Sequence, residues 1–470
     1  MTLAPHIPQV LVRYGRGDDW VGAFLLSSQP SAISRIQLLV GAPFMAGRHL
    51  SGTLSGVIAS LIHLDINGFV ILRALNVLVL GVILIQLNQF LWTLNYSQWY
   101  RITVLAIVTS LPGLIYWTSH TGSVTYLLGA SAAFWAGIRF VRAQSTLQLC
   151  LPILLVVSSV FLYQPSVVLA LVAPTLVSIR HKNTVCGTEP IVKYQLLLAP
   201  LASVLALIVN LVVVSVSGKT QRLASPTTLE ALERIWGEIV PKTIFPWPAL
   251  FGVSNLAIRT LSQVFLGYCL VAMLVVAYRN RSRAQGLITL DNAVRLTMPI
   301  VCLVLLTVPL AFTQPVDGMR VNVFSSVVFW TLVIGTAVQL HPVLRNQFIV
   351  HLSAICSCVL AAGMSTLFMI STVLPAAREW HCSLEASAYN SYPVTLPLRT
   401  EEVRQHGIIA NDEWLSTSLE LPNPARFQIL ASYEHLGIDS RLKVSIWEVP
   451  DSKPGSPPTP WEQTFIACVE

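Results

Sequence analysis

The sequence predicts an all-α polytopic membrane bundle of about ten transmembrane helices, followed by a small C-terminal α+β or β-rich soluble domain. Hydrophobic residues make up 54% of the 470 residues and charged residues only 11%, whereas a soluble domain carries about 25% charged residues. The apolar residues gather in runs of about 20, the length of a helix that crosses the hydrocarbon core of a bilayer. A lipid bilayer is therefore the expected environment of most of the chain.

The predicted bundle occupies residues 69-374. Its candidate spans are residues 69-92, 102-117, 122-140, 148-162, 165-180, 194-216, 261-278, 296-313, 321-340 and 348-374. The two spans on either side of Gln164 and Pro165 could instead form one long kinked helix, because proline interrupts the helical hydrogen-bond ladder. Residues 217-260 are expected to form a long outer loop that contains a short amphipathic helix.

Lysine and arginine residues predict the orientation of the bundle. The loops at 118-121 and 163-164 carry none of them, and the loop at 314-320 carries only Arg320. The alternate loops carry Arg101, Arg139, Arg142, Arg180, Lys182, Lys193, Arg279, Arg281, Arg283, Arg295 and Arg345, so these loops face the cytoplasm by the positive-inside rule. The net charge of +7 reflects this pattern. No nucleic-acid partner is expected, because no basic stripe is interleaved with exposed aromatic residues.

Residues 1-68 are expected outside, as an acidic loop followed by interfacial helices. Segment 21-45 is mildly apolar, but Pro30, Arg35 and Pro43 interrupt it, which favours an interfacial helix pair over a span. Ten spans place both chain ends outside, yet no signal peptide is visible that would export this region. We therefore expect that one more N-terminal span belongs to the protein and is absent from this chain.

Residues 375-470 are polar and are expected to form an extracytoplasmic domain. The alternation of apolar and polar residues at 442-446 predicts a strand, and the segment 450-460 is rich in Pro, Ser and Gly. Because this domain should face an oxidising compartment, we predict a disulfide between Cys382 and Cys468.

An acidic pair, Asp18 and Asp19, precedes Trp20 near the outer membrane interface. Two adjacent carboxylates suit a general base or a cation site, because mutual repulsion in a partly buried pair raises the pKa of one of them. The alternative is an acidic turn in a solvated loop. No spacing indicates zinc; the sequence requires no cofactor, and a divalent metal stays an open question.

Further polar residues fall on the same predicted outer side. Arg48 opens an apolar helix at 50-63, where it is either an anion ligand or a snorkelling interfacial arginine. His120 lies in a loop too short to leave the membrane surface, so it either contacts substrate or joins Trp117 in an aromatic anchor. Asp65 is expected to cap the next span.

Gln164, Asp317 and Arg320 complete this set. Gln164 interrupts an apolar stretch at its outer end, which suits a polar pocket between helices or a plain turn. Asp317 and Arg320 form either a local salt bridge or a pair that brings Arg320 to a phosphate. Polar residues without a common role would lie on both faces of the bundle, so their convergence predicts an outward-facing site at the membrane surface.

In chain order these motifs resemble those of the polytopic O-antigen glucosyltransferases of the bacteriophage seroconversion type, within the wider GT-C class. The resemblance covers roughly residues 15-375. The family usually has proline after Gly-Arg, where this chain has His49. The matching residues are Asp18-Asp19, Gly47-Arg48-His49-Leu50, Asp65 and Leu162-Tyr163-Gln164-Pro165.

The resemblance implies an enzyme of the bacterial inner membrane with a site that faces outside. Such enzymes transfer a sugar, here expected to be glucose, from a polyprenyl-phosphate donor to a polysaccharide acceptor, with inversion at the anomeric carbon. It implies that Asp18 or Asp19 is the base, and that Arg48 and Arg320 hold the donor phosphate. Gln164, His120 and Asp317 are the further predicted substrate contacts.

Two other functions stay open. A polysaccharide polymerase or ligase is also polytopic with a large outer loop, although residues 217-260 lack a dense set of Arg and His. A lipid or small-molecule transporter commonly has repeated halves and broken helices, whereas no internal repeat is visible here and few charges lie within the spans. Sugar transfer is therefore the favoured function.

Overall fold

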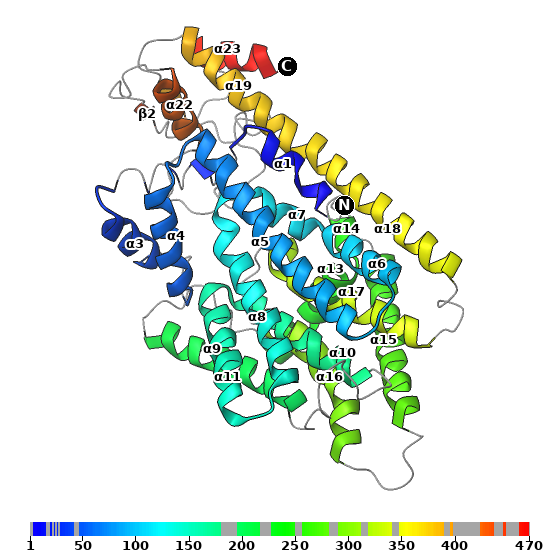
Figure 1. Ribbon diagram of the computed structural model, residues 1–470. Coiled ribbons are helices and arrows are strands. Elements are labelled where there is room, and N and C mark those ends of the chain that lie inside the picture. The colour runs from blue at the N-terminus through cyan, green and yellow to red at the C-terminus, as the bar shows by residue number, and fades with distance from the viewer. Residues whose placement is uncertain are drawn as a thin grey trace.

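The computed structural model is almost entirely helical within the residues that it describes (Figure 1). Two strands of three residues, β1 (Thr395–Pro397) and β2 (Ser445–Trp447), pair in parallel. The described residues are 3-15, 19-20, 23, 26, 29-41, 47-179, 195-216, 227-249, 256-281, 290-311, 318-340, 347-389, 395-397, 424-436, 445-447 and 460-469.

Within this described part, four helices are long and apolar enough to cross a membrane, or five when one bent pair counts as a single span. They indicate an integral membrane protein. The four are α5 (Ile66–Thr93), η3 with α8 (Thr121–Ser123 and Val124–Arg142), α11 (Gln195–Val216), and the continuous helix of α18, η7 and α19 (Gln347–Phe368, Met369–Val373 and Leu374–Tyr389).

The remaining predicted spans coincide with helices whose fully described apolar parts are shorter. The number of about ten spans therefore stays a prediction. These helices are α9 (Thr146–Leu162), η4 with α10 (Gln164–Leu171 and Val172–Ile179), α15 (Leu256–Arg281), α16 (Leu290–Ala311) and α17 (Gly318–Leu340).

The predicted span 102-117 is broken into two helices. α6 (Gln98–Thr109) and α7 (Pro112–Ser119) are bent by 63° relative to each other. The break lies where a residue that precedes proline adopts an extended backbone, because the proline ring disfavours helical geometry in the residue before it. The indole of Trp247 donates to the carbonyl of Ser110 at 3.1 Å, so a distant segment satisfies the backbone at the break.

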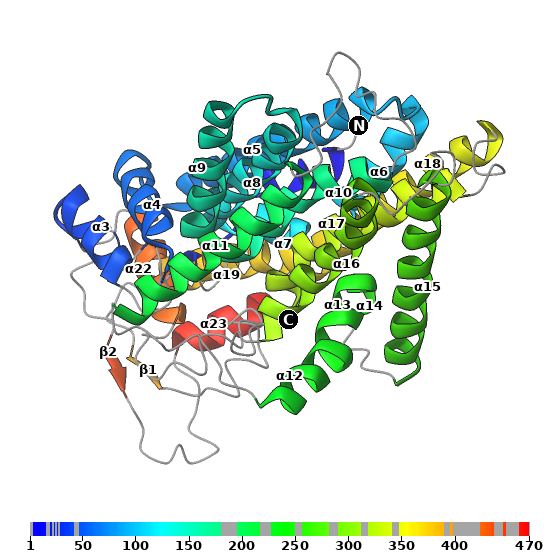
Figure 2. The ribbon, with the colours of Figure 1, turned by 90° about the horizontal axis from the view of Figure 1, so that it is seen from below.

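Trp247 belongs to the predicted outer loop 217-260, whose described part packs against the bundle beside α15 and α17 (Figure 2). Ile244 is buried there, and its carbonyl accepts a hydrogen bond from the indole of Trp330 at 3.0 Å. The expected amphipathic helix is therefore present, but the chain that follows it enters the bundle. This segment consists of α12 (Thr228–Arg234), η5 (Ile235–Ile239), α13 (Val240–Ile244) and α14 (Pro246–Ala249).

The chain reverses between α9 and η4, so these are two packed segments and not one kinked helix. Tyr163 separates them with an extended backbone, at φ −161° and ψ 106°. Pro165 then lies in the first turn of η4, where its missing amide hydrogen removes no helical bond. α8 packs against η4 so closely that a Cβ on Gly137 would collide with the carbonyl of Ala170, which explains the glycine.

Two short helices, α3 (Ala32–Gly41) and α4 (His49–Leu61), form a packed hairpin at one side of the bundle (Figure 1). Arg35 joins them by donating to the carbonyl of Ala59 at 2.6 Å. The predicted cap of the next span is confirmed, because the Asp65 carboxylate accepts from the amide of Gly68 at 2.7 Å at the start of α5.

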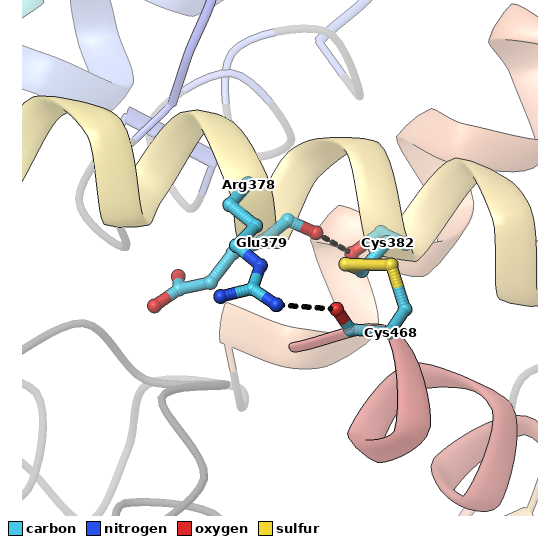
Figure 3. The surroundings of a disulfide bond; sticks show 5 residues. Arg378, Glu379, Cys382 and Cys468 are labelled. Carbon is cyan, nitrogen blue, oxygen red and sulfur yellow. Dashed lines mark hydrogen bonds between the residues drawn. A yellow bond between two sulfur atoms is a disulfide. The ribbon is translucent and has the colours of Figure 1, made fainter. Parts of the chain in front are cut away.

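The C-terminal chain gathers at the end of the bundle where α5 begins, and it is mainly helical where it is described (Figure 1). α22 (Pro424–His435) and α23 (Pro460–Val469) both pack on α19. The predicted disulfide between Cys382 and Cys468 is confirmed, with a Cα–Cα distance of 5.5 Å (Figure 3). The predicted α+β or β-rich domain is not shown: β1 and β2 are the strands found in the described part, and residues 442-444 lie outside it.

The N-terminal segment is packed against the bundle. It contains η1 (Ala4–His6) and α1 (Pro8–Leu11), which contact α18 and α5. His6 and Gln9 are fully buried. Their side chains meet at Thr118 of α7, with His6 Nδ1 at 2.8 Å and Gln9 Oε1 at 3.0 Å from the hydroxyl. Polar contacts therefore fix this segment against the broken span.

Burial of His6 predicts a loss of stability in acid. Desolvation lowers the pKa of His6 from 6.5 to about 4, so the unfolded chain binds a proton in a range where the folded protein does not. The free energy of unfolding should therefore fall as the pH drops from about 6.5 to about 4, by up to about 3 kcal/mol from this group. Thermal unfolding in detergent at several pH values measures it, and His6→Gln should flatten the dependence. An equally steep pH dependence in His6→Gln would contradict the assignment.

Candidate functional site

A fully buried ion pair joins Asp19 to Arg73, which lies two turns into α5. Arg73 Nη2 lies 3.1 Å from Asp19 Oδ2, and neither side chain is exposed to solvent. Arg73 Nε donates to the carbonyl of Ser119 at 2.8 Å, and the ring of Tyr14 covers the guanidinium, with its centroid 3.6 Å from Cζ. The positive charge is therefore held by a carboxylate, a helix-end carbonyl and an aromatic face.

The second oxygen of Asp19 is also occupied. Asp19 Oδ1 accepts from the hydroxyl of Thr121 at 2.6 Å and from the amide of Thr121 at 3.2 Å. Asp19 thus links the N-terminal segment to α5 through Arg73 and to the turn between α7 and α8 through Thr121. Because both carboxylate oxygens are used within the fold, this residue is poorly placed to take a proton from a substrate.

The C-terminal end of α7 is capped by side chains from α5. The last carbonyls of a helix lack helical partners, and here Arg73 takes that of Ser119 while Asn76 Nδ2 donates to the carbonyl of His120 at 2.7 Å. A cation at this end also interacts favourably with the helix dipole. These bonds fix the backbone that carries His120.

The His120 ring is partly exposed and oriented by its own loop. Its Nδ1 accepts from the amide of Gly122 at 3.2 Å, so the neutral ring carries its proton on Nε2. The ring lies against Tyr116, with the centroids 5.9 Å apart, and Trp117, at 6.3 Å. His120 is therefore both a member of an aromatic cluster and a fixed hydrogen-bond donor.

Three aromatic rings connect His120 to Arg48. Trp117 contacts Tyr126 at 5.0 Å and Tyr163 at 5.5 Å between ring centroids. Tyr126 and Tyr163 stack on each other at 4.5 Å. Aromatic pairs at these distances pack as rigid units, so the three rings form a rigid aromatic surface between His120 and Arg48.

Arg48 lies on this aromatic surface. Its Cζ is 4.8 Å from the ring centroid of Tyr163 and 5.4 Å from that of Tyr126. Nε donates to Gln164 Oε1 at 3.0 Å, and Nη1 donates to the hydroxyl of Tyr126 at 3.4 Å. The side chain is half-buried, and no carboxylate lies within ion-pair distance of it among the described residues. A guanidinium with neutral partners keeps its charge available for an anion.

Gln164 is itself fixed by a second layer of polar groups. Its Nε2 donates to Asn210 Oδ1 at 3.4 Å, and Asn210 Nδ2 donates to the carbonyl of Gly47 at 2.6 Å. Gly47 has φ +72° and a Cβ there would collide with Asn210, so glycine is required on both counts. The Gly47-Arg48 motif and the Gln164-Pro165 motif thus meet through Asn210 on α11.

The structure brings some of the predicted site residues together and leaves others undescribed. Arg48 and Gln164 are in direct contact, and Asp19 is hydrogen-bonded to the residue next to His120. Asp18 and Asp317 lie outside the described residues, and Arg320 lies in the first turn of α17 with its side chain outside them. α17 packs against η4 and α7, the elements of Gln164 and Trp117.

Three partners of this site were not predicted from the sequence: Arg73, Asn76 and Asn210. Arg73 lies inside the predicted span 69-92, where an arginine is expensive and needs a specific partner. The energetic cost of an arginine within a span could have identified Arg73 from the sequence alone. The expectation that few charges lie within the spans did not take Arg73 into account. Among the described residues no group of three or more His, Cys, Asp or Glu side chains gathers that could hold a metal ion.

The likeness to the seroconversion glucosyltransferases stays a prediction. No protein-family model matches the chain, and no curated protein or solved structure matches it either. The function must therefore be inferred from the side chains, above all from Arg48, which lies on aromatic rings and has no carboxylate partner among the described residues.

The buried ion pair predicts strong and coupled effects on stability. Asp19→Asn and Arg73→Met should each lower the free energy of unfolding by about 3–5 kcal/mol, because each leaves a buried group without its partner. The double variant should lose less than the sum, since it removes both charges. Thermal unfolding in detergent measures all three.

The exposed pair of His63 and Asp65, at 4.0 Å, supplies the control. His63→Gln should change stability little, because exposed ion pairs contribute little. Additive losses from Asp19→Asn and Arg73→Met would show that the two residues act independently.

Proposed function

We propose that the protein is a membrane glycosyltransferase. It moves a sugar, expected to be glucose, from a polyprenyl-phosphate carrier to a surface polysaccharide at the outer face of the bacterial inner membrane, with inversion at the anomeric carbon. One observation carries the proposal: Arg48 has no carboxylate partner among the described residues, and Gln164 and two stacked tyrosines hold it in place. A fixed, half-buried guanidinium of this kind suits a phosphate bound at the edge of a bundle.

Arg48 would bind the donor phosphate. Two parallel N–H groups of a guanidinium match two phosphate oxygens, and the charge on these oxygens grows as the sugar leaves. The hydrogen bond to Gln164 and the tyrosine faces support this role, because they orient the guanidinium without neutralising it. Arg320, on α17, is proposed as a second ligand of the same phosphate, with Asp317 beside it, and His120 as a donor to substrate.

Asp18 is the proposed base. Both oxygens of Asp19 accept hydrogen bonds from Arg73 and Thr121, which leaves Asp18 as the member of the pair for chemistry. The acceptor hydroxyl oxygen attacks the anomeric carbon and passes its proton to the Asp18 carboxylate. The bond from the anomeric carbon to the phosphate oxygen breaks, and polyprenyl phosphate leaves with the electron pair. A single displacement of this kind inverts the anomeric carbon.

The break between α6 and α7 also raises the transporter alternative, because transporters place substrate at broken helices. Here the carbonyl of Ser110 at the break accepts from Trp247. A backbone acceptor satisfied by a packed tryptophan is a poor ligand for a transported solute. This contact supports the transferase over the transporter.

Asp18→Asn should abolish sugar transfer without unfolding the protein. Removal of a general base typically lowers kcat by about 10²–10⁴-fold. Purified protein in nanodiscs, with synthetic polyprenyl-phosphate-glucose and surface polysaccharide as acceptor, measures it. The matched variant Asp19→Asn should act chiefly by lowering the amount of folded protein. Wild-type turnover by Asp18→Asn would refute the assignment of the base.

Arg48→Lys should lower kcat/KM by at least about tenfold, because an ammonium cannot present two parallel N–H groups to a phosphate. Arg139→Lys is the control, since Arg139 lies at the far end of α8 over Trp135. Steady-state kinetics with the same donor separates the two. Equal activity of the two variants would exclude Arg48 from phosphate binding.

A further inference from the structure

Helix α19 packs against the N-terminal segment that contains the acidic pair. Tyr14 and Trp20 flank the acidic pair in sequence, and both are buried against this helix. Tyr14 packs with Val373 and Ala376, at the junction of η7 and α19. The same Tyr14 ring covers Arg73. α19 therefore packs against the aromatic ring that lies on the buried ion pair.

Trp380 of α19 supports the other side of the segment. Its ring stacks on that of Trp20 with a centroid distance of 4.7 Å and an interplanar angle of 24°. Phe69 of α5 meets the Trp20 ring edge-on at 5.0 Å. Trp20 directly follows Asp19 in the chain, so these ring contacts lie one residue from the acidic pair.

The C-terminal chain holds α19 at several points. The disulfide ties Cys382 to Cys468 of α23, and Arg378 Nη2 donates to the carbonyl of Cys468 at 3.0 Å (Figure 3). Farther along α19, Ser387 Oγ accepts from the indole of Trp461 at 3.2 Å. α23 is thus fastened to α19 over more than one turn.

Helix α22 also packs against Trp380 and its apolar neighbours. His435 meets the Trp380 ring edge-on at 5.9 Å, and Ala431 packs into the same apolar cluster as Trp20 and Phe69. Trp380, which is 6% exposed, therefore contacts both the C-terminal helix α22 and Trp20 of the acidic segment.

We propose that Trp380 is a positioning residue for the acidic pair, and that the Cys382–Cys468 disulfide keeps it in place. Trp380 fixes Trp20, Trp20 fixes the backbone of Asp19, which is the neighbour of Asp18 in the chain, and the disulfide holds α19 to the C-terminal chain. The C-terminal region is then part of the site. The catalytic meaning of this role rests on the proposed function, whereas the mechanical coupling does not.

Hydrogen–deuterium exchange of the full chain in nanodiscs tests the coupling without any substrate. Trp380→Ala and the double variant Cys382→Ser with Cys468→Ser should speed exchange at least about tenfold in peptides that contain Tyr14 and Trp20. Trp380→Phe should restore slow exchange, because a phenyl ring still packs on Trp20. Trp236→Ala is the control, since Trp236 is 45% exposed on η5.

Unchanged exchange at Tyr14 and Trp20 in Trp380→Ala would overturn the proposal. So would faster exchange spread evenly over α5, α8 and α19, because Trp380 would then be a general stabilising residue.

Kinetics with polyprenyl-phosphate-glucose tests the catalytic meaning. Trp380→Ala should lower kcat by about tenfold or more with KM nearly unchanged, since a small displacement of a base slows the chemical step. Trp380→Phe should recover most of the loss. A higher KM with unchanged kcat would overturn the positioning role. If the wild-type protein transfers no sugar while the exchange result holds, the coupling stands and the proposed function fails.

Discussion

The fold around the candidate site depends on the buried pair of Asp19 and Arg73. Placing both charges away from water is costly, and the cost is offset only when the remaining donors and acceptors are also matched. Thr121 and Ser119 supply hydrogen bonds of this kind, and the ring of Tyr14 covers the guanidinium, whose Nη1 has no hydrogen-bond partner among the described residues. Three separate parts of the chain are thereby fixed to one point: the N-terminal segment, the start of α5 and the turn after α7. The position of His120 follows directly from this arrangement.

The two arginines of the region show how environment assigns different roles to one side chain. Arg73 is fully buried and faces a carboxylate, so its charge is used within the fold. Arg48 is half-buried and faces an amide and two rings, so the described part of the chain orients its charge without cancelling it. Tyrosine lies under both guanidinium groups, and it therefore does not distinguish the roles. The partner that does is the carboxylate.

Several features of the fold and site could be predicted from the sequence because each depends on local chemistry. Apolar runs predicted helices, Asp65 before a span predicted a cap, and two cysteines in a polar tail predicted a disulfide. The meeting of Arg48 and Gln164 was anticipated only as a shared side of the membrane. Arg48 donates directly to Gln164, and Asn210 holds Gln164 and Gly47 from α11. Asn210 lies in an ordinary apolar helix and has no sequence signature.

Other features depend on packing between distant segments. The span predicted at 102-117 is instead bent by 63° before Pro112, and the free carbonyl of Ser110 at the break is satisfied by Trp247, which lies far away in the chain. The choice between Asp18 and Asp19 likewise needed the position of Arg73. The strand predicted at 442-446 overlaps β2 at residues 445-446, and its partner strand β1 lies about 50 residues away in the chain, so the pairing had no local signal.

The order of residues along the chain has a consequence for membrane insertion. Arg73 lies about 10 Å into α5, and an arginine within an apolar helix opposes insertion by about 2.5–3.5 kcal/mol on translocon scales. Tyr14 and Asp19 precede α5, so they leave the ribosome before the helix that needs them. Ser119 and Thr121 follow only with α7 and α8. The N-terminal segment is thus available to pair with α5 as soon as that helix is synthesised, and the contacts from α7 and η3 can be added only later.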